Sequence, residues 1–258
     1  MKSLGERMKE YEAVSKSRLL RRCPVIIRID GCHFHTFTKG FDKPFDELFM
    51  ESMISTTKRL CEEIQGCVLG YTQSDEISLV LCDYKNLDTA AWFDNQVQKI
   101  CSVSAALATM IFNEEFSGRI MERRAKVYEE TMSVEAADTF YTKYIRALLS
   151  GAYFDSRCFN LLKEEVCNYL IWRQQDAERN SILGLAQSMY SHSELHGISC
   201  KKLQDKMFTE NGVNWNDIDS GKKRGVVIAK PEEGGFVPWP ETPIFSQNRD
   251  FVERRITF

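Results

Sequence analysis

The predicted fold is decided by residues 25–31, VIIRIDG, and by residues 70–81, GYTQSDEISLVL. The first stretch is a run of β-branched residues that ends in Asp30 beside a glycine, which is typical of a buried strand. The second reads as a strand, a tight polar turn that contains Asp75, and a returning strand. Each aspartate therefore lies at the end of a predicted strand.

Two carboxylates on neighbouring strand ends are what a Mg²⁺ site for phosphoryl transfer requires. Mg²⁺ binds only one or two protein carboxylates and fills its other positions with waters and substrate phosphate oxygens. The alternative is an ordinary Asp-Gly turn after the first strand and a solvated acidic tip on the hairpin. Taken together, Asp30 and Asp75 favour the metal site.

The composition is that of an ordinary globular protein, because 43% of the 258 residues are hydrophobic and 28% are charged. No apolar run is long enough to span a bilayer and the N-terminus lacks a signal-peptide core, so we expect a cytoplasmic protein with no membrane partner. The nine cysteines form no Cys-x-x-Cys pair and do not cluster with the four histidines, which argues against a zinc site. The net charge of −3 does not favour nucleic-acid binding, so local basic clusters would have to provide it.

The order of predicted elements indicates an α+β fold. The elements expected in the first part of the chain are a polar helix near residues 5–20, a strand at 25–30, a helix from about 46, a hairpin at 67–82, a helix around 93–111, a helical stretch at 134–149 and a strand at 152–161. This is the ferredoxin-like order, in which both helices cover one face of an antiparallel sheet. The first strand then lies beside the hairpin, so Asp30 and Asp75 meet at one edge. Polymerase palms and nucleotide cyclases bind triphosphates with this geometry, although many small binding domains share the fold without a metal.

The second part of the chain reads as mostly helical. The elements expected there are a helix from 163 to about 190, a helix at 199–211, a strand at 225–229 and irregular structure at 231–243. We therefore predict a palm-like catalytic domain over residues 1–162, with an insertion at about 117–150. Residues 163–258 form a helical extension whose strand completes the catalytic unit.

Residues near the first aspartate supply what a triphosphate site needs. A chain that turns at 31–35 can offer backbone N–H groups to phosphate oxygens and the Gly31 carbonyl to a metal. Lys39 and Lys43 bring two ammonium groups back towards the same edge, and Lys99 on the second helix is a third candidate. The ordinary alternative is that the lysines are solvated and that the histidines at 33 and 35 are packed.

Motifs along most of the chain resemble those of one enzyme family. They are RIDG at 28–31, FH at 34–35, Phe37, KP at 43–44, YxQSDExS at 71–78, FDxR at 154–157, YLxWRQxD at 169–176 and KRG at 223–225. Together they resemble the tRNA(His) guanylyltransferase family. Residues 117–150 are the least family-like part of the chain.

The resemblance implies a polymerase-like palm that adds nucleotides to the 5′ end of tRNA, opposite to the usual direction. ATP, or GTP, activates the 5′-monophosphate, and the 3′-hydroxyl of an incoming nucleoside triphosphate then attacks the activated phosphate. Two Mg²⁺ ions held by Asp30, Asp75 and the Gly31 carbonyl serve both steps. Members of the family form tetramers, so we expect a homotetramer.

The residue analysis and the resemblance together give three sets of candidate site residues. The catalytic set is Asp30, Asp75, Lys43 and Ser74. The nucleotide-binding set is Arg28, Gly31, Cys32, His33, Phe34, His35, Ser74 and Lys99. The tRNA-binding set is Arg157, Arg173, Asn180, Lys223 and Arg224.

One departure from the family pattern bears on the substrate. Eukaryotic members carry His-Ile-Asn-Asn where this chain has Glu178-Arg179-Asn180-Ser181, so only Asn180 matches. The departure resembles the "like-protein" branch of bacteria and archaea, which restores missing 5′ nucleotides with the opposite acceptor strand as template. We therefore predict template-dependent tRNA repair, with conventional addition of one guanosine to tRNA(His) as the alternative.

Two other hypotheses of function agree less well with the sequence. A palm-type nucleotide cyclase would carry a Gly-Gly-Asp/Glu-Glu-Phe turn, which is absent here. A non-catalytic RNA-binding module would show aromatic and basic residues on its central strands, whereas Ile27, Ile29, Leu79 and Leu81 look like core residues.

Overall fold

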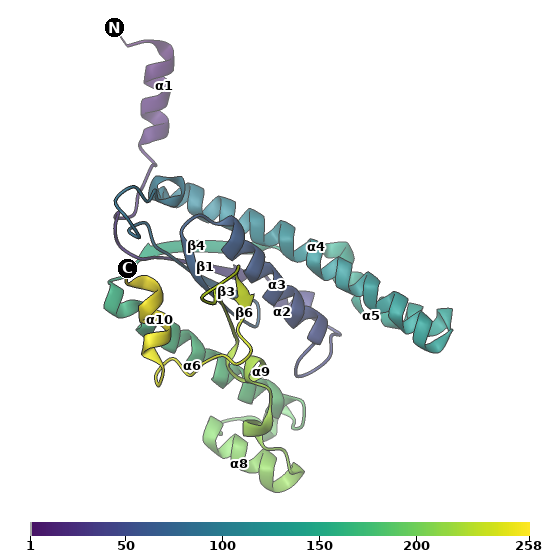
Figure 1. Ribbon diagram of the computed structural model, residues 1–258. Coiled ribbons are helices and arrows are strands. Elements are labelled where there is room, and N and C mark those ends of the chain that lie inside the picture. The colour runs from purple at the N-terminus through teal and green to yellow at the C-terminus, as the bar shows by residue number, and fades with distance from the viewer. Residues whose placement is uncertain (1) are drawn as a thin grey trace.

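Strand β1 (Val25–Gly31) lies inside a six-stranded antiparallel sheet, between β4 and β3 (Figure 1). The computed structural model describes residues 2–258. The other strands are β2 (Cys67–Gln73), β3 (Glu76–Leu81), β4 (Phe154–Asn160), β5 (Val226–Ala229) and β6 (Val237–Pro238), in the spatial order β4-β1-β3-β2-β5-β6. The order of the first four strands is that of the ferredoxin-like arrangement, so the α+β prediction is confirmed.

The strand register sets which residues meet at the end of β1. Asp30 is paired with Glu76 on β3 and with Asp155 on β4. Side chains alternate between the two faces of a strand, so Ile27 and Ile29 point to the face opposite Asp30. Both isoleucines are fully buried, as the sequence predicts for core residues.

The helices of the chain cover both faces of the sheet. They are α1 (Leu4–Ala13), α2 (Phe34–Phe37), α3 (Glu47–Glu63), α4 (Val97–Thr131), α5 (Val134–Ser150), α6 (Lys163–Gln187), α7 (His192–Leu195), α8 (Cys200–Asn211), α9 (Ser220–Arg224) and α10 (Arg249–Ile256), with short 3₁₀ turns η1 (Trp92–Asn95) and η2 (Trp215–Asp217). Helices α3 and α4 pack on the face of Ile27, and an aromatic cluster around Phe34, Phe112 and Phe154 extends this core. None of the helices within residues 2–258 is long and apolar enough to cross a lipid bilayer.

The predicted extension shares the sheet with the predicted palm. Val166, Cys167 and Leu170 of α6 pack against Ile26 and Val80 on the second face. Strand β5 pairs with β2 in the same sheet. The two helices of the palm therefore do lie on one face, while α6 and α10 cover the other.

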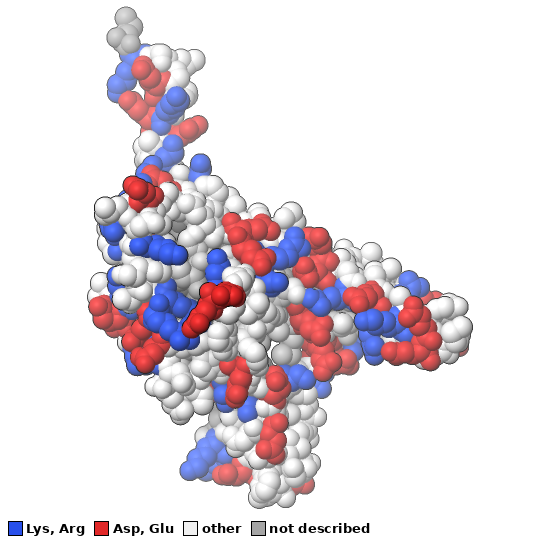
Figure 2. Space-filling view, viewed as in Figure 1, with Lys and Arg blue, Asp and Glu red and all other residues white. Residues whose placement is uncertain are grey.

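Two helices differ in length from their predicted ranges. Helix α1 ends at Ala13 rather than near residue 20, buries no side chain and extends away from the body (Figure 1). Helix α4 continues to Thr131 because α5 runs back along it and gives Phe116 and Ile120 a core to join. The predicted insertion is thus an arm made of the end of α4 and of α5, on which basic and acidic side chains are interspersed (Figure 2).

Gly70→Ala should destabilise the fold, since a Cβ on this β2 residue would lie 2.5 Å from the Cys61 sulfur and 3.0 Å from a Thr57 carbon on α3. Overpacking of this kind costs about 1–3 kcal/mol in the free energy of unfolding, which urea denaturation can measure. The matched control is Gly118→Ala on the exposed side of α4, where a Cβ would have no heavy atom within 4 Å. That change should stabilise the protein by about 1 kcal/mol. Equal effects of the two changes would contradict the packing described for β2 and α3.

Candidate active site at the ends of β1 and the β2–β3 turn

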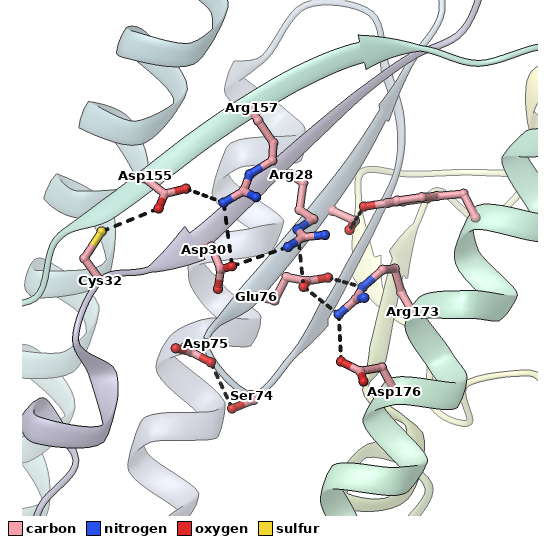
Figure 3. Close-up of polar contacts among 12 residues, drawn as sticks. Arg28, Asp30, Cys32, Ser74, Asp75, Glu76, Asp155, Arg157, Arg173 and Asp176 are labelled. Carbon is pink, nitrogen blue, oxygen red and sulfur yellow. Dashed lines mark hydrogen bonds and ion pairs between the residues drawn. The ribbon is translucent and has the colours of Figure 1, made fainter.

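Asp30 and Asp75 are brought to the same edge of the sheet, as the sequence predicts. The backbone N–H of Gly31 donates to the carbonyl of Asp75 at 3.0 Å, which joins the end of β1 to the β2–β3 turn. Ser74 adopts a φ of 50° in this turn, and its hydroxyl donates to the Asp75 carboxylate at 3.1 Å. Figure 3 shows both carboxylates at this edge.

The charge at this edge suits a cation. Burial, followed by repulsion from Asp30, raises the pKa of Asp75. A divalent cation would offset both effects, and the two carboxylates with the Gly31 carbonyl could supply the oxygen ligands that Mg²⁺ prefers. Within residues 2–258 no group of three or more His, Cys, Asp and Glu side chains is placed to hold a metal ion. Asp30 and Asp75 alone would offer two carboxylates, a number that Mg²⁺ accepts.

The loop after β1 is fixed by a glycine and a phenylalanine. A Cβ on Gly31 would lie 2.3 Å from the Phe34 ring, so no other residue fits without moving that ring. His33, with a φ of 57°, begins α2, and both His33 and His35 are exposed. The Phe34 side chain is only 4% exposed and packs in the aromatic core. Its predicted contact with a nucleotide is therefore limited to its backbone.

A cleft of about 630 Å³ opens beside Asp75. The predicted site residues that line it are Gly31, His33, Phe34, His35, Lys43, Ser74 and Asp75. A smaller cavity of about 160 Å³ lies beyond Pro44, Ser74 and Gly184, which line both spaces, and Asn180 contributes to its wall. The structure therefore gathers most of the predicted nucleotide-binding residues around one cleft.

A chain of ion pairs runs along the other side of the aspartates (Figure 3). Arg173 donates two hydrogen bonds to the Glu76 carboxylate, at 2.7 and 2.8 Å, and a third to Asp176 at 2.9 Å. The Arg28 guanidinium lies 3.5 Å from Glu76 and 3.6 Å from Asp30. Burial raises the pKa of Glu76, and the two arginines oppose this shift.

The series of ion pairs continues from Asp30 to residues of β4. Arg157 lies 3.9 Å from Asp30 and donates to Asp155 at 3.0 Å. The Cys32 sulfur is 3.8 Å from Asp155, and burial together with this carboxylate raises the pKa of the thiol. Two guanidinium groups therefore flank Asp30, while Cys32 stays a neutral thiol that faces an acidic neighbour.

Four predicted site residues lie away from the cleft or the surface. Arg28 and Cys32 do not line the cleft. Arg173 is 5% exposed and is held by Glu76 and Asp176, so its predicted contact with tRNA stays a prediction that this burial does not favour. Lys99 is exposed near the start of α4, with its ammonium 5.7 Å from the Phe93 ring. Because α4 starts where β3 ends, this position is at the end of the sheet away from Asp30.

The remaining basic residues of the tRNA set lie on α9, which packs against α6. The Lys223 ammonium donates to the Asn216 carbonyl at 2.6 Å. The Arg224 guanidinium lies 3.7 Å from Glu178, and its backbone carbonyl accepts a hydrogen bond from the Tyr71 hydroxyl at 2.6 Å. Glu178, one of the departures from the family pattern, therefore faces a cation of this cluster.

Sequence reasoning missed the role of Glu76. This residue directly follows Asp75, and alternation along β3 puts it on the same face as Ser78, where α6 packs. A carboxylate on a buried face needs a cationic partner. Arg173 in the motif at 169–176 is such a cation, and it could have indicated the ion pair with Glu76.

Comparison with known proteins agrees with this geometry. A family model described as tRNAHis guanylyltransferase matches residues 5–162. A solved bacterial tRNA(His) guanylyltransferase-like protein in complex with ATP is 42% identical, with a TM-score of 0.83 over 99% of this chain and 100% of that chain. A solved structure described in the same words, in complex with GTP, is 39% identical, with a TM-score of 0.79 over 100% of both chains.

Curated relatives extend the likeness to eukaryotes. The probable tRNA(His) guanylyltransferase of Dictyostelium discoideum is 26% identical over 225 residues, which are 82% of this chain and 77% of that protein. These matches confirm the palm-like fold and set aside the nucleotide cyclase and the non-catalytic RNA-binding module. The chain belongs to the tRNA(His) guanylyltransferase family of nucleotidyltransferases.

Proposed function

We propose that this protein adds nucleotides in the 3′-to-5′ direction to the 5′ end of tRNA, in a reaction that requires Mg²⁺. The observation that carries the proposal is the asymmetry around the aspartates. A cleft of about 630 Å³ lies on one side, and Arg28 and Arg157 lie on the other. The family membership and the solved relatives in complex with ATP and with GTP support the proposal.

The cleft residues suit a nucleoside triphosphate. Backbone N–H groups of residues 33–35 and the Lys43 ammonium would bind its phosphate oxygens, because the N–H groups of Gly31 and Cys32 donate to the Asp75 and Tyr153 carbonyls. The Ser74 hydroxyl would keep Asp75 oriented. Asp30, Asp75 and the Gly31 carbonyl would hold Mg²⁺, which when bound offsets the charge that builds up on phosphate oxygens.

The arginines on the other side suit the 5′-monophosphate of the RNA. Guanidinium groups form charge-assisted hydrogen bonds to phosphate, and Arg28 and Arg157 already converge on Asp30. Glu76 would hold Arg28 in place, because its carboxylate is itself fixed by two hydrogen bonds from Arg173. Triphosphate and RNA end would then meet at the aspartates from opposite sides.

The chemistry consists of two transfers. In the first, an oxygen of the RNA 5′-monophosphate attacks the α-phosphate of ATP or GTP, and pyrophosphate leaves. In the second, the 3′-hydroxyl of an incoming nucleoside triphosphate attacks the activated 5′-phosphate, and the nucleoside monophosphate leaves. No covalent bond to the protein forms, so the residues act through positioning and charge.

We further propose that the reaction is template-dependent repair of tRNAs that lack 5′ nucleotides. The support is the sequence at 178–179, where Glu178 pairs with Arg224. This pair leaves fewer free polar groups to reject a tRNA other than tRNA(His). The homotetramer and the cytoplasmic location expected from the sequence stay predictions.

Asp30→Ala and Asp75→Ala should each slow 5′ extension by about 100-fold or more, because each removes a carboxylate that would hold Mg²⁺ beside the transferring phosphate. Asp75→Ala should leave the folded state as stable as before or more stable, because the change removes a buried carboxylate that Asp30 repels. Asp30→Ala relieves the same repulsion but also removes the ion-pair partner of Arg28 and Arg157, so no gain in stability is expected from it. The measurement is extension of a 5′-truncated tRNA transcript with Mg²⁺, ATP and GTP. Asp88→Ala in an exposed loop is the control and should keep full activity. Near-normal activity of either site variant would contradict the two-aspartate metal site.

Glu76→Gln should lower the free energy of unfolding by about 3 kcal/mol, because it leaves the buried Arg173 guanidinium without its carboxylate partner on β3. The change should also reduce activity, since Arg28 loses a partner. The urea midpoint at an unchanged slope gives the stability. Glu253→Gln removes an exposed i,i+4 partner of Arg249 and should cost less than about 0.5 kcal/mol. The role assigned to Glu76 is wrong if both variants unfold at the same urea concentration.

Substrate choice separates repair from conventional guanylylation. Repair predicts that several truncated tRNAs are extended by the base that pairs with the opposite strand, at rates that favour Watson–Crick pairs. The measurement offers all four nucleotides to a truncated non-histidine tRNA and, in parallel, to intact tRNA(His). Extension of intact tRNA(His) alone, by one guanosine opposite its unpaired position, would identify a conventional guanylyltransferase.

A further inference from the structure

Trp172 of α6 is an exposed tryptophan in a charged environment. Its exposed fraction is 52%, whereas Trp215, which packs in the small core between α6 and α8, is 8% exposed. Large aromatic side chains normally bury most of their surface, so an indole left half open beside a polar site needs an explanation.

The surroundings of the indole connect it to the aspartates. The Arg173 guanidinium lies 4.4 Å from its ring centroid, and the Tyr169 ring lies 6.0 Å away. The Arg28 guanidinium lies 5.9 Å from the same ring and 3.6 Å from Asp30. The Arg28 guanidinium therefore lies between Trp172 and Asp30.

The indole lies apart from the cleft assigned to the triphosphate. Neither Trp172 nor Arg28 lines that cleft. The exposed indole is instead grouped with Arg28 and Arg157, the cations assigned above to the 5′-monophosphate of the RNA. A ligand that reaches Trp172 would therefore arrive with the RNA end.

We propose that Trp172 is a stacking platform for an unpaired base of the RNA, namely the nucleotide of the opposite strand that faces the 5′ end. This inference rests on the proposed function. Aromatic side chains bind single-stranded bases through their flat faces without regard to sequence, and nearby arginines bind the adjoining phosphates. Stacking on Trp172 holds the opposite-strand base in place while the 5′-phosphate is bound by Arg28 and Arg157. All four bases have a flat face, so the platform accepts each of them.

A purely structural role is the competing explanation. The indole covers Arg173, and a cation–π contact contributes to holding that guanidinium. A leucine would cover the same group but would offer no flat face to a base. Trp172→Leu removes both the flat face and the cation–π contact, and Trp172→Phe keeps both. An RNA that has no base to stack therefore has to separate the structural role from stacking.

The experiment measures binding with the full chain and without catalysis. The RNA is a tRNA transcript that lacks its first nucleotide, and a second RNA carries an abasic residue at the opposite-strand position that faces the 5′ end. The proteins are the wild type, Trp172→Leu, Trp172→Phe and, as a control, Phe208→Leu. Phe208 is 60% exposed on α8, away from the sheet (Figure 1). Circular dichroism and thermal unfolding check the fold of each variant, and ATP binding is measured separately.

Trp172→Leu should weaken binding of the truncated tRNA about 10-fold, a loss within the range found for base–aromatic stacking. Trp172→Phe should restore most of the affinity, and Phe208→Leu should change nothing. The wild type and Trp172→Leu should bind the abasic RNA equally, because that RNA has no base to stack. ATP affinity should be the same in all four proteins.

Three results would overturn the inference. The first is that a folded Trp172→Leu binds the truncated tRNA as tightly as the wild type does, and the second is that it loses equal affinity for the truncated tRNA and for the abasic RNA. The third is that Trp172→Leu loses affinity for ATP and not for RNA. The third would assign the indole to the base of the triphosphate. If the proposed function is wrong and the stacking inference is right, the result differs from these three. The wild type would then bind the RNA through Trp172 but would not extend its 5′ end.

Discussion

The buried ion pair between Glu76 and Arg173 determines how helix α6 lies on the sheet. The apolar contacts of α6 with β1 and β3 are non-directional and would tolerate small shifts of the helix. Two hydrogen bonds at 2.7 and 2.8 Å from one guanidinium to one carboxylate tolerate much less. Glu76 follows Asp75 in the chain and is paired with Asp30 in the sheet, so this fixed point lies at the site itself. Such a pair need not stabilise the fold, and its value here is positional.

The same pair explains why the site has two unlike sides. On the side of Arg173 and Asp176, in the middle of α6, guanidinium groups and carboxylates alternate from Asp176 through Arg173, Glu76 and Arg28 to Asp30. On the other side, the loop after β1 and the β2–β3 turn leave an open cleft with Lys43 at its wall. The proposed reaction brings together two polyanions, which would need to approach the aspartates without sharing a binding surface. The sheet edge suits this proposal because it has an open cleft on one side of the aspartates and the Arg28 and Arg157 guanidinium groups on the other.

Much of the fold and of the aspartate pair could be predicted, because alternation along β1 and β3 sets both burial and register. The end of α4 could not be read from its apolar stripe, since Phe116 and Ile120 join a core that Tyr144 and Ala147 of α5 complete. Arg173 matched a family motif, but a motif does not state burial, and the arginine is used inside the protein. The position of Lys99 follows from topology: β3 runs away from the site, so the helix that follows starts at the far end. Glu76 was missed because its partner is almost one hundred residues away in the chain.

The place of β5 has a consequence for synthesis of the chain. Strand β2 pairs with β5, and Gly225 fits so closely beside Thr72 and Tyr71 that a Cβ there would lie 2.5 Å from the Thr72 carbonyl. Until residues 226–229 leave the ribosome, β2 is an edge strand with unpaired backbone groups, and the face that α6 and α10 cover is incomplete. Open edges of this kind pair readily with other chains. A nascent chain that stalls before β5 is therefore expected to be prone to aggregate.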